Sequence, residues 1–429
     1  MRTVLLAAVI FTLVLGCASR VAAQQPSQAS VQAIRAELDR LKQEMTALET
    51  RLATLEGGAP AAPAQPAQAG APTPTAEVPS GAAGAGGPQG ALPIYGNVSA
   101  ASKIFNPDMA VIGDFLGAGG KNGVNPSPAM EMHESEASFQ AFVDPYARAD
   151  FFVSFGEEGV ELEEGFVTFP AIPGGLLLKV GKIRAAFGKV NGLHNHVLPW
   201  TDRPLVINNL VGGEEGIDDA GMSVARLIPN PWIFLEATGQ VFRGDSSDLF
   251  KSSKRGDLSY VGHLRAYQDV TENGNLDFGA SYSRGHNALG VVDGVDIGRF
   301  TTDLYGVDAT YRWRPLARSI YHSFIGRSEV VWSRRDQPTG RQDAVGYYVS
   351  GDYQFARRWF AGARYDRSDQ PGAASLRDTG QSATLTYWPS EFSQVRGQYR
   401  RTKYAEALTA HEFLFQFQFA IGAHGAHVF

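Results

Sequence analysis

The chain of 429 residues contains a single cysteine, Cys17, and this excludes a disulfide framework. It also lacks an excess of positive charge, because 38 Lys and Arg stand against 44 Asp and Glu, and a net charge of −6 argues against a nucleic-acid-binding surface. Beyond the N-terminus, no segment approaches the ~18 consecutive apolar residues of a membrane helix. If the mature chain crosses a membrane, it does so with strands.

The N-terminal 1–23 segment has the pattern of a secretory signal peptide. One arginine precedes an apolar run, and Val21-Ala22-Ala23 offers a small-residue cleavage site. The stretch 14–17 also resembles a bacterial lipobox, which would place a lipid on Cys17. Cleavage after Ala23 is favoured, and the two processing sites stay open as alternatives.

Residues 24–56 are predicted to form a coiled coil in the periplasm. Its apolar residues follow steps of three and four, which is the heptad pattern of a left-handed supercoil. The core positions are Val31, Ile34, Leu38, Leu41, Met45, Leu48, Leu52 and Leu55. A single helix lying on another surface would show a wider apolar stripe. The pattern therefore favours self-association, and a homotrimer is expected although the heptads do not fix the oligomer number.

Residues 57–92 are rich in Ala, Pro and Gly and are predicted to form a linker, since they cannot build a core. From 93 to 429 the composition changes to short segments that alternate apolar and polar residues, which predicts an all-β outer-membrane barrel. Sixteen antiparallel strands are expected, or eighteen if 93–107 adds one. The expected strands are 108–116, 130–143, 146–155, 160–169, 175–184, 219–227, 232–243, 258–268, 276–284, 302–314, 320–334, 344–355, 359–366, 380–388, 393–401 and 409–421.

The connections between these strands are alternately short and mostly long, which is the asymmetry of outer-membrane barrels. The expected long set includes 185–218, 335–343 and 367–379. Five tryptophans fall at strand ends, and four of them lie on the short-turn side, where indole rings sit at a membrane interface. They are Trp232, Trp313, Trp359 and Trp388, with Trp332 on the other side.

The last strand places aromatic side chains on every second position. Phe413, Phe415, Phe417, Phe419 and Ile421 share one face, and Gln416 and Gln418 lie on the other. One face is expected to meet lipid and the other a wetter lumen. The chain ends on Phe429, and such an ending resembles the C-terminal signal that the barrel insertion machinery reads.

The longest connection, 185–218, carries a resemblance to a known family. The residues Val180-Gly181-Lys182-Ile183-Arg184, Phe187-Gly188, Asp202-Arg203-Pro204-Leu205, Gly216 and Ala220-Gly221 resemble the phosphate-selective porin O/P family. The resemblance implies a porin whose third long loop folds into the lumen and narrows it. The coiled coil in turn resembles the periplasmic extension of some sugar-specific porins.

Charged and polar residues of this loop are the expected solute contacts: Lys189, His194, His196, Asp202, Arg203, Glu214 and Glu215. The expected lumen wall includes Arg148, Asp150, Arg265, Arg312, Arg327, Arg364 and Arg396. Because the signs are mixed, the lumen should favour polar solutes through a transverse field and should not trap phosphate. Arg203 precedes Pro204 on a stiffened stretch and is expected to act on anions. Alternatively, Arg203 pairs with Asp202 or the wall and holds the loop.

Other chemistry is weakly indicated. His194 and His196 have no carboxylate or cysteine beside them in the sequence, so loop packing is favoured over a metal site, and no cofactor is expected. Asp269–Gly274 resembles half a calcium loop but lacks the closing Glu, so a hairpin turn explains it better. No G-x-S-x-G motif occurs, and an enzyme is not expected.

The sequence therefore predicts a passive outer-membrane porin for small polar or ionic solutes, with no nucleic-acid partner. Two alternatives belong to other classes. A TonB-dependent receptor would need a larger barrel and an N-terminal plug, and a low-complexity linker cannot form one. A structural tether would use the barrel only as an anchor for the coil.

Overall fold

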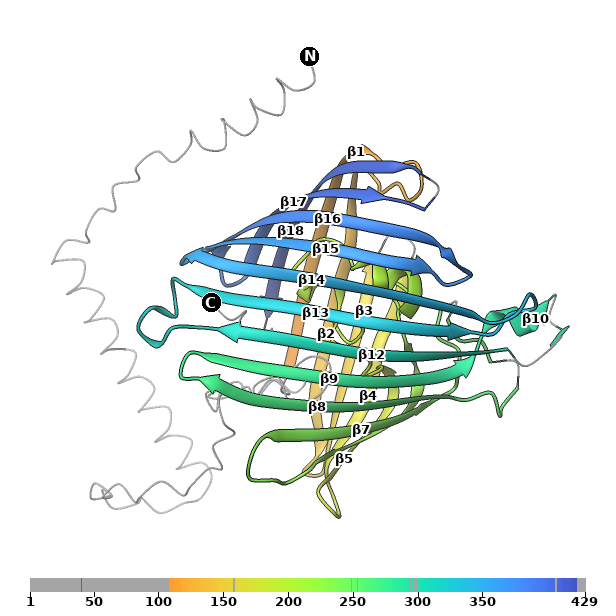
Figure 1. Cartoon of the computed structure of the whole chain (residues 1–429). Coiled ribbons are helices and arrows are strands. Elements are labelled where there is room, and N and C mark those ends of the chain that lie inside the picture. The colour runs from red at the N-terminus through yellow and green to blue at the C-terminus, as the bar shows by residue number, and fades with distance from the viewer. Residues whose placement is uncertain are drawn as a thin grey trace, which may run out of the picture. The chain divides into compact units, whose positions relative to one another are not determined.

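In a computed structural model, the chain forms a closed barrel of sixteen antiparallel strands (Figure 1). The structure describes Arg40 and residues 108–422, except 157, 158, 248, 253, 293, 294, 297–299 and 406. The prediction of a sixteen-stranded barrel is confirmed. Within the described residues, no helix has the length and apolar character needed to span a membrane. The predicted signal peptide, coiled-coil core and linker lie outside this part of the chain, as do segment 93–107 and Phe429.

The strands follow one another around the barrel in chain order, and β1 closes the ring by pairing with both β2 and β18. The barrel strands are β1 (Asp108–Lys121), β2 (Met130–Asp144), β3 (Ala147–Gly156), β4 (Gly159–Ile172), β5 (Leu176–Arg184), β6 (Asp218–Leu227), β7 (Phe234–Phe242), β8 (Ser259–Thr271), β9 (Gly274–His286), β12 (Thr301–Trp313), β13 (Ser323–Arg335), β14 (Gln342–Ala356), β15 (Trp359–Gln370), β16 (Ala373–Ser390), β17 (Ser393–Lys403) and β18 (Thr409–Gly422).

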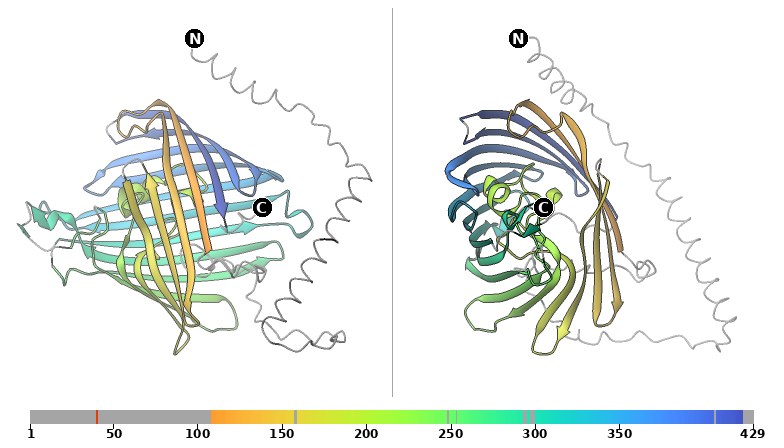
Figure 2. Two further views of the ribbon diagram at one scale, coloured as in Figure 1. Left: turned by 180° about the vertical axis from the view of Figure 1, so that it is seen from behind. Right: turned by 90° about the vertical axis from the view of Figure 1, so that its right-hand side faces the viewer.

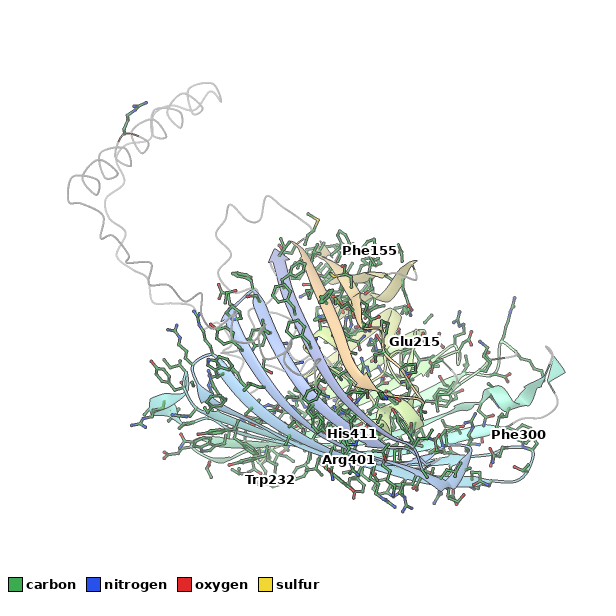
Figure 3. The ribbon with its side chains drawn as sticks, turned by 90° about the horizontal axis from the view of Figure 1, so that it is seen from above. Phe155, Glu215, Trp232, Phe300, Arg401 and His411 are labelled. Carbon is green, nitrogen blue, oxygen red and sulfur yellow. The ribbon has the colours of Figure 1, made fainter. Side chains whose placement is uncertain are left out.

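The final strand has two unlike faces, as its sequence predicts. On β18, Phe413 is 68% exposed and Phe415 is 44% exposed, whereas Gln416 and Gln418 are buried inside the barrel. The strand pairs along its length with β1, so its backbone groups are satisfied and the barrel has no open edge there. The aromatic side chains therefore cover the outer surface. Figure 3 shows how side chains project from both faces of the barrel wall.

Two connections differ from the sequence prediction. The expected long loop 367–379 is wrong, because β15 and β16 run on until only residues 371 and 372 join them. Their extension is supported across the strands by an ion pair from Arg377 Nε to Asp369 Oδ1 at 2.8 Å. The connection between β9 and β12 carries a small unpredicted hairpin of β10 (Val291–Val292) and β11 (Val295–Asp296).

The tryptophans predicted at strand ends lie where short turns join the strands. Trp313 ends β12, Trp359 begins β15, and Trp388 lies near the end of β16. Trp232 lies in the turn between β6 and β7 and is 79% exposed. These indole rings therefore gather at one rim of the barrel.

Candidate functional site

Loop 3, residues 185–217 between β5 and β6, lies inside the ring of strands (Figure 2, right). It contains the 3-10 helix η3 (Asn195–Val197) and the π-helix η4 (Ile207–Val211). The π-helix ends at Gly212, whose φ of 108° is a left-handed conformation that suits glycine. Short helices and glycine turns let the chain fold back on itself within the lumen.

Loop 3 has an apolar core that it shares with the barrel wall. Its contribution is Phe187, Val190, Leu198, Trp200, Val206, Ile207, Leu210, Val211 and Ile217, all at most 3% exposed. The wall contributes Phe152, Phe166, Ile183, Phe242, Val261, Leu304, Val331, Ala344 and Tyr348. This apolar patch on the inner face was not predicted from the sequence. The available signal was the large apolar side chains at lumen-facing positions, such as Leu304 and Val331.

Asp202, near the middle of loop 3, anchors the loop to β15 and β17. Arg364 Nη2 and Arg400 Nη1 donate to Asp202 Oδ2 at 2.8 and 3.0 Å, and Gln398 Nε2 donates to Oδ1 at 2.5 Å. Arg364 also lies over the Trp200 ring, 4.7 Å from its centroid. Burial alone would raise the pKa of Asp202, but the two guanidinium groups outweigh it and lower that pKa to about 2.

Lys189 connects the start of loop 3 to another stretch of wall, formed by β9, β12 and β13. Its Nζ lies 2.9 Å from Asp277 Oδ1 on β9 and 3.8 Å from Asp308 Oδ1 on β12. Its backbone N–H donates to Glu329 Oε2 on β13 at 3.3 Å. With the Asp202 contacts, these bonds fix loop 3 to several parts of the circumference.

His194 and His196 meet β2 and β4. His194 Nε2 lies 2.9 Å from Glu164 Oε2, and its Nδ1 contacts Glu136. His196 Nδ1 lies 3.3 Å from Glu134 Oε1. The expectation that the histidines lack nearby carboxylates is wrong, because the carboxylates come from strands distant in the sequence.

The carboxylates around the two histidines also alter their protonation. Burial disfavours the charged imidazolium of His194, but the neighbouring Glu136 and Glu164 outweigh burial and raise the pKa of His194 well above its ordinary value. The pKa of His196 is raised in the same way, against burial, by Glu136 and Glu134. Without a metal ion, both imidazoles are therefore suited to pair with the wall as cations.

Arg203 lies inside loop 3 and is 5% exposed. Its Nη1 donates to Val190 O at 3.1 Å, its Nη2 donates to Leu193 O at 2.6 Å, and its Nε donates to Asn195 Oδ1 at 3.1 Å. These acceptors belong to the loop itself, so the geometry corrects the expectation that Arg203 touches solutes. The alternative role of holding the loop fits, although the partners are neither Asp202 nor the wall.

The remaining loop charges are more accessible. The side chain of Glu214 is 57% exposed and lies 3.3 Å from His133 Nε2 on β2. Glu215 is also exposed, and it is labelled in Figure 3. The Lys189 side chain is 22% exposed. Of the seven loop residues predicted to contact solute, these three keep accessible charges, whereas His194, His196 and Arg203 are buried. The seventh, Asp202, has a side chain that is 12% exposed and bound to the wall.

Most of the predicted lumen-wall arginines are paired with carboxylates. Arg148 Nη2 lies 2.7 Å from Asp150 Oδ1, Arg265 Nη2 lies 2.6 Å from Asp277 Oδ2, and Arg327 Nη1 lies 2.5 Å from Asp352 Oδ2. Arg312 Nη1 is 3.6 Å from Asp277 Oδ2, and Arg364 Nε is 2.7 Å from Asp366 Oδ2. Arg396 instead donates to neutral acceptors, among them Leu198 O at 2.9 Å. Positive charge on the wall is thus largely compensated.

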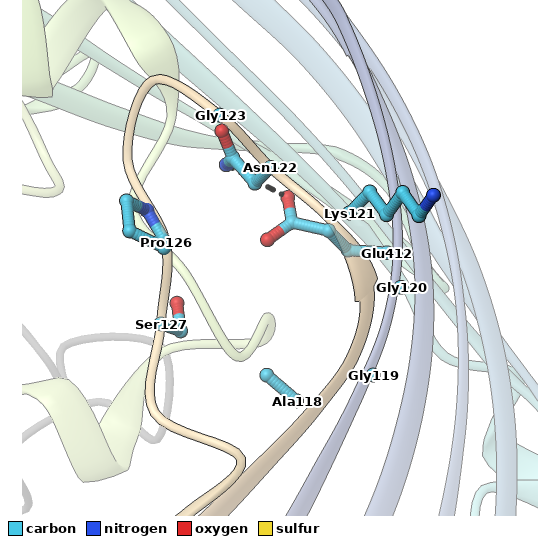
Figure 4. A pocket seen from close by; sticks show the side chains of 9 residues that line it. All are labelled: Ala118, Gly119, Gly120, Lys121, Asn122, Gly123, Pro126, Ser127 and Glu412. Atoms are coloured by element: carbon cyan, nitrogen blue, oxygen red, sulfur yellow. Dashed lines mark hydrogen bonds between the residues drawn. The ribbon is translucent and has the colours of Figure 1, made fainter.

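A cavity of about 300 Å³ lies at the long-loop end of β1 and β18 (Figure 4). Its lining is Ala118, Gly119, Gly120, Lys121, Asn122, Gly123, Pro126, Ser127 and Glu412. The Glu412 carboxylate already accepts from Asn122 Nδ2 at 3.2 Å and from Arg400 Nη2 at 2.6 Å. The carboxylate of Glu412 in this cavity is therefore already hydrogen-bonded to Asn122 and Arg400.

Comparison with known proteins places this geometry among barrels. No family model matches the chain. An uncharacterized protein of Aquifex aeolicus (strain VF5) is 28% identical over 389 residues, which cover 76% of this chain and 81% of that protein. An anion-selective porin from Comamonas acidovorans superposes with a TM-score of 0.52 at 11% identity, over 73% of this chain and 99% of that chain. The fold is that of outer-membrane porins.

A second solved structure supports the outer-membrane barrel fold. It is a loop L8 deletion mutant of OmpT, an outer membrane protein of Vibrio cholerae, and it has a TM-score of 0.50 at 10% identity. It covers 73% of this chain and 99% of its own. At these identities the likeness concerns the fold alone, and neither selectivity nor the predicted O/P family membership follows from it.

Proposed function

We propose that the protein is a porin of the bacterial outer membrane, through which small polar or ionic solutes diffuse passively. The observation that carries the proposal is the position of loop 3 inside a closed barrel, with charged side chains fixing it to the wall. A barrel that served only as an anchor would not need a charged, internally bonded loop in its lumen. The exposed aromatic face of β18 supports lipid as the surroundings of the barrel.

The proposed channel has weak ion selectivity. Five of the wall arginines named above lie within 4 Å of a carboxylate oxygen, and accessible loop charges of both signs remain at Lys189 and Glu214. Paired charges produce a local transverse field and little net potential. Such a lumen favours polar solutes without selecting strongly for phosphate or another anion.

The assembly proposed for this porin is a homotrimer, with the coiled coil as a stalk in the periplasm. The segment ending in Phe429 is proposed to address the chain to the barrel insertion machinery. Both proposals depend on segments beyond the described residues, and they rest on the heptad spacing and on the C-terminal pattern.

Conductance in planar bilayers tests the channel proposal. Purified, folded protein should give stepwise conductance, and the reversal potential in a salt gradient should stay close to zero. The matched control is the same preparation after heat unfolding, because it contains the same chain without a closed lumen. Folded barrel with no conductance at any voltage would contradict the porin and favour the tether.

A further inference from the structure

Six buried side chains converge where loop 3 meets the wall. Glu134 and Glu136 come from β2, Glu163 and Glu164 from β4, and His194 and His196 from loop 3. Each of the six residues is at most 8% exposed. This group is called the His–Glu cluster below. It joins three segments that lie far apart in the sequence, and none of its members was predicted to be a metal ligand.

A β-bulge aims two consecutive carboxylates into the His–Glu cluster. In the pairing of β3 with β4, Phe152 lies opposite Glu164 and Val153 lies opposite Leu162, so Glu163 is an extra residue. Neighbouring residues of a regular strand point to opposite faces, and a bulge changes this alternation. Glu163 and Glu164 therefore both contact His194 from inside the barrel.

The spacing of the side chains suits a metal ion. Potential ligand atoms of Glu136, His194 and His196 all lie within 4.8 Å of one another, and those of Glu134, Glu136 and Glu163 do as well. Ligands bonded to one zinc ion at about 2 Å lie at most about 4 Å apart, so only small side-chain shifts are needed. The atoms come from three elements, as a metal that joins a loop to a wall would require.

Charge also favours a bound cation. Arg184 compensates one of the four carboxylates, because its Nη2 lies 3.2 Å from Glu163 Oε2. Burying carboxylates together is unfavourable unless cations compensate them. The cluster can reach this balance with two imidazolium ions or with a divalent metal bound by neutral imidazoles.

We propose that Glu136, His194 and His196 bind a divalent transition-metal ion, with Glu134 and Glu163 available to complete its coordination. Imidazole together with carboxylate suits Zn²⁺ and similar ions better than Mg²⁺ or Ca²⁺, which prefer oxygen ligands alone. Glu164 is a positioning residue. It contacts His194 Nε2 at 2.9 Å and so directs Nδ1 toward the ion, as carboxylates commonly do for metal-bound histidines.

The bound ion would pin loop 3 to β2 and β4 and so help to fix the shape of the lumen. The site does not depend on the proposed channel activity, because binding can be measured without conductance. A folded protein that binds the metal but gives no conductance would refute the proposed porin and leave the metal site. A protein that conducts but binds no metal would refute the metal site and leave the proposed porin.

Zinc binding to the folded, full-length protein tests the proposal. The protein is treated with chelator, dialysed against Zn²⁺ at neutral pH, and analysed for metal per chain. Wild type should hold one equivalent more than His194→Asn/His196→Asn. His263→Asn is the matched control, because His263 faces the lumen from β8 and contacts Ser281 Oγ at 2.9 Å, away from the cluster. This control should keep the full equivalent.

Two conservative variants separate metal ligation from loop packing. Glu136→Gln keeps the shape of a proposed ligand and should abolish the extra equivalent. Glu164→Gln should keep the stoichiometry while weakening zinc affinity about 10- to 100-fold. Co²⁺ added in place of Zn²⁺ should give visible ligand-field bands in wild type and not in Glu136→Gln.

Equal metal content in wild type and in the double histidine variant would overturn the site and leave a network of protonated histidines and carboxylates. Folding of each variant is checked by the faster migration of unboiled barrel in gels. If the double variant does not fold, the Glu136→Gln comparison decides. If wild type holds no more zinc per chain than the Glu136→Gln variant, the proposed metal site is also wrong.

Discussion

Asp202 shows how one carboxylate can fix a loop inside a barrel. It accepts from Arg364 on β15 and from Arg400 and Gln398 on β17, and its side chain is 12% exposed. Since the two guanidinium groups hold the pKa of Asp202 at about 2, the ionised form is favoured in the folded state. The ionised carboxylate therefore contributes stability above the ordinary carboxyl pKa, and this contribution is lost as the pH falls through about 2.

Asp202→Asn should lower the free energy of unfolding at pH 7 by about 2 kcal/mol, from a pKa difference of nearly two units at about 1.4 kcal/mol each. The difference from wild type should shrink as the pH falls from about 4 to about 2. Denaturant unfolding in detergent at several pH values measures this.

Asp245→Asn is the control for Asp202→Asn, because Asp245 pairs with Lys251, whose side chain is 51% exposed, at a more accessible site. Such an exposed ion pair should contribute about 1 kcal/mol or less to the free energy of unfolding. A difference between wild type and Asp202→Asn that stays constant down to pH 2 would rule out the assigned linkage.

Arg203→Ala should loosen loop 3 without changing ion preference. The substitution removes donors to Val190 O, Leu193 O and Asn195 Oδ1, and buried acceptors without partners cost about 1–3 kcal/mol each. Noisier single-channel conductance and an unchanged reversal potential are expected in planar bilayers.

Arg203→Lys separates geometry from charge. A lysine keeps the positive charge but cannot reproduce the planar fork that reaches three acceptors. Both variants should therefore show noisier single-channel conductance than wild type. A reversal potential that moves with Arg203→Ala and stays in place with Arg203→Lys would show that the charge acts on passing ions after all.

At the scale of elements, loop 3 depends on the strands around it for its conformation. Its helices are a single turn each, and helices of this length are unstable alone. The packing of Trp200 and Leu210 against wall residues such as Leu304 and Tyr348 supplies the missing stabilisation. The barrel wall is less dependent on the loop, because its strands are joined by their own backbone hydrogen bonds.

Replacing 190–212 by a short Gly-Ser linker should therefore raise conductance while the barrel stays closed. Single-channel recording gives the conductance, and the gel migration of unboiled protein reports the closed barrel. Shortening 336–341, which joins β13 and β14, is the matched control and should leave conductance unchanged. Equal conductance in the trimmed and intact channels would mean that loop 3 does not narrow the pore.

At the scale of the whole molecule, the barrel and the heptad segment are expected to have separate roles. The barrel closes through pairing among strands that lie between Asp108 and Gly422. The heptads are expected to add an association surface.

Deleting 31–56 should weaken the oligomer and leave the barrel folded. Chemical crosslinking in detergent measures the oligomer, and migration of unboiled protein measures the barrel. A deletion of similar length within 57–92 is the control, since it shortens the chain without removing heptads. Unchanged crosslinking after the first deletion would show that barrel surfaces suffice for assembly.

The strand pattern alone determined most of the barrel. Residues such as Phe415 and Gln416 must point to opposite sides of a strand, and this period of two marks the predicted strands. The pattern gave a wrong prediction for 367–379. The polar residues there are typical of a loop in composition, but in the structure they continue β15 and β16. Polar alternation resembles loop composition wherever a strand lacks a clearly apolar face.

Only the tertiary structure decided what loop 3 does with its side chains. Arg203 and His194 read as solute contacts in the sequence, yet both are buried. One carboxylate that His194 contacts, Glu136, lies 58 positions earlier in the sequence. The arginines that bind Asp202 follow it by more than 160 positions. An irregular loop has no periodicity that assigns a face to each residue. Its side chains take the positions that distant strands provide, and closure of the barrel brings those strands around the loop.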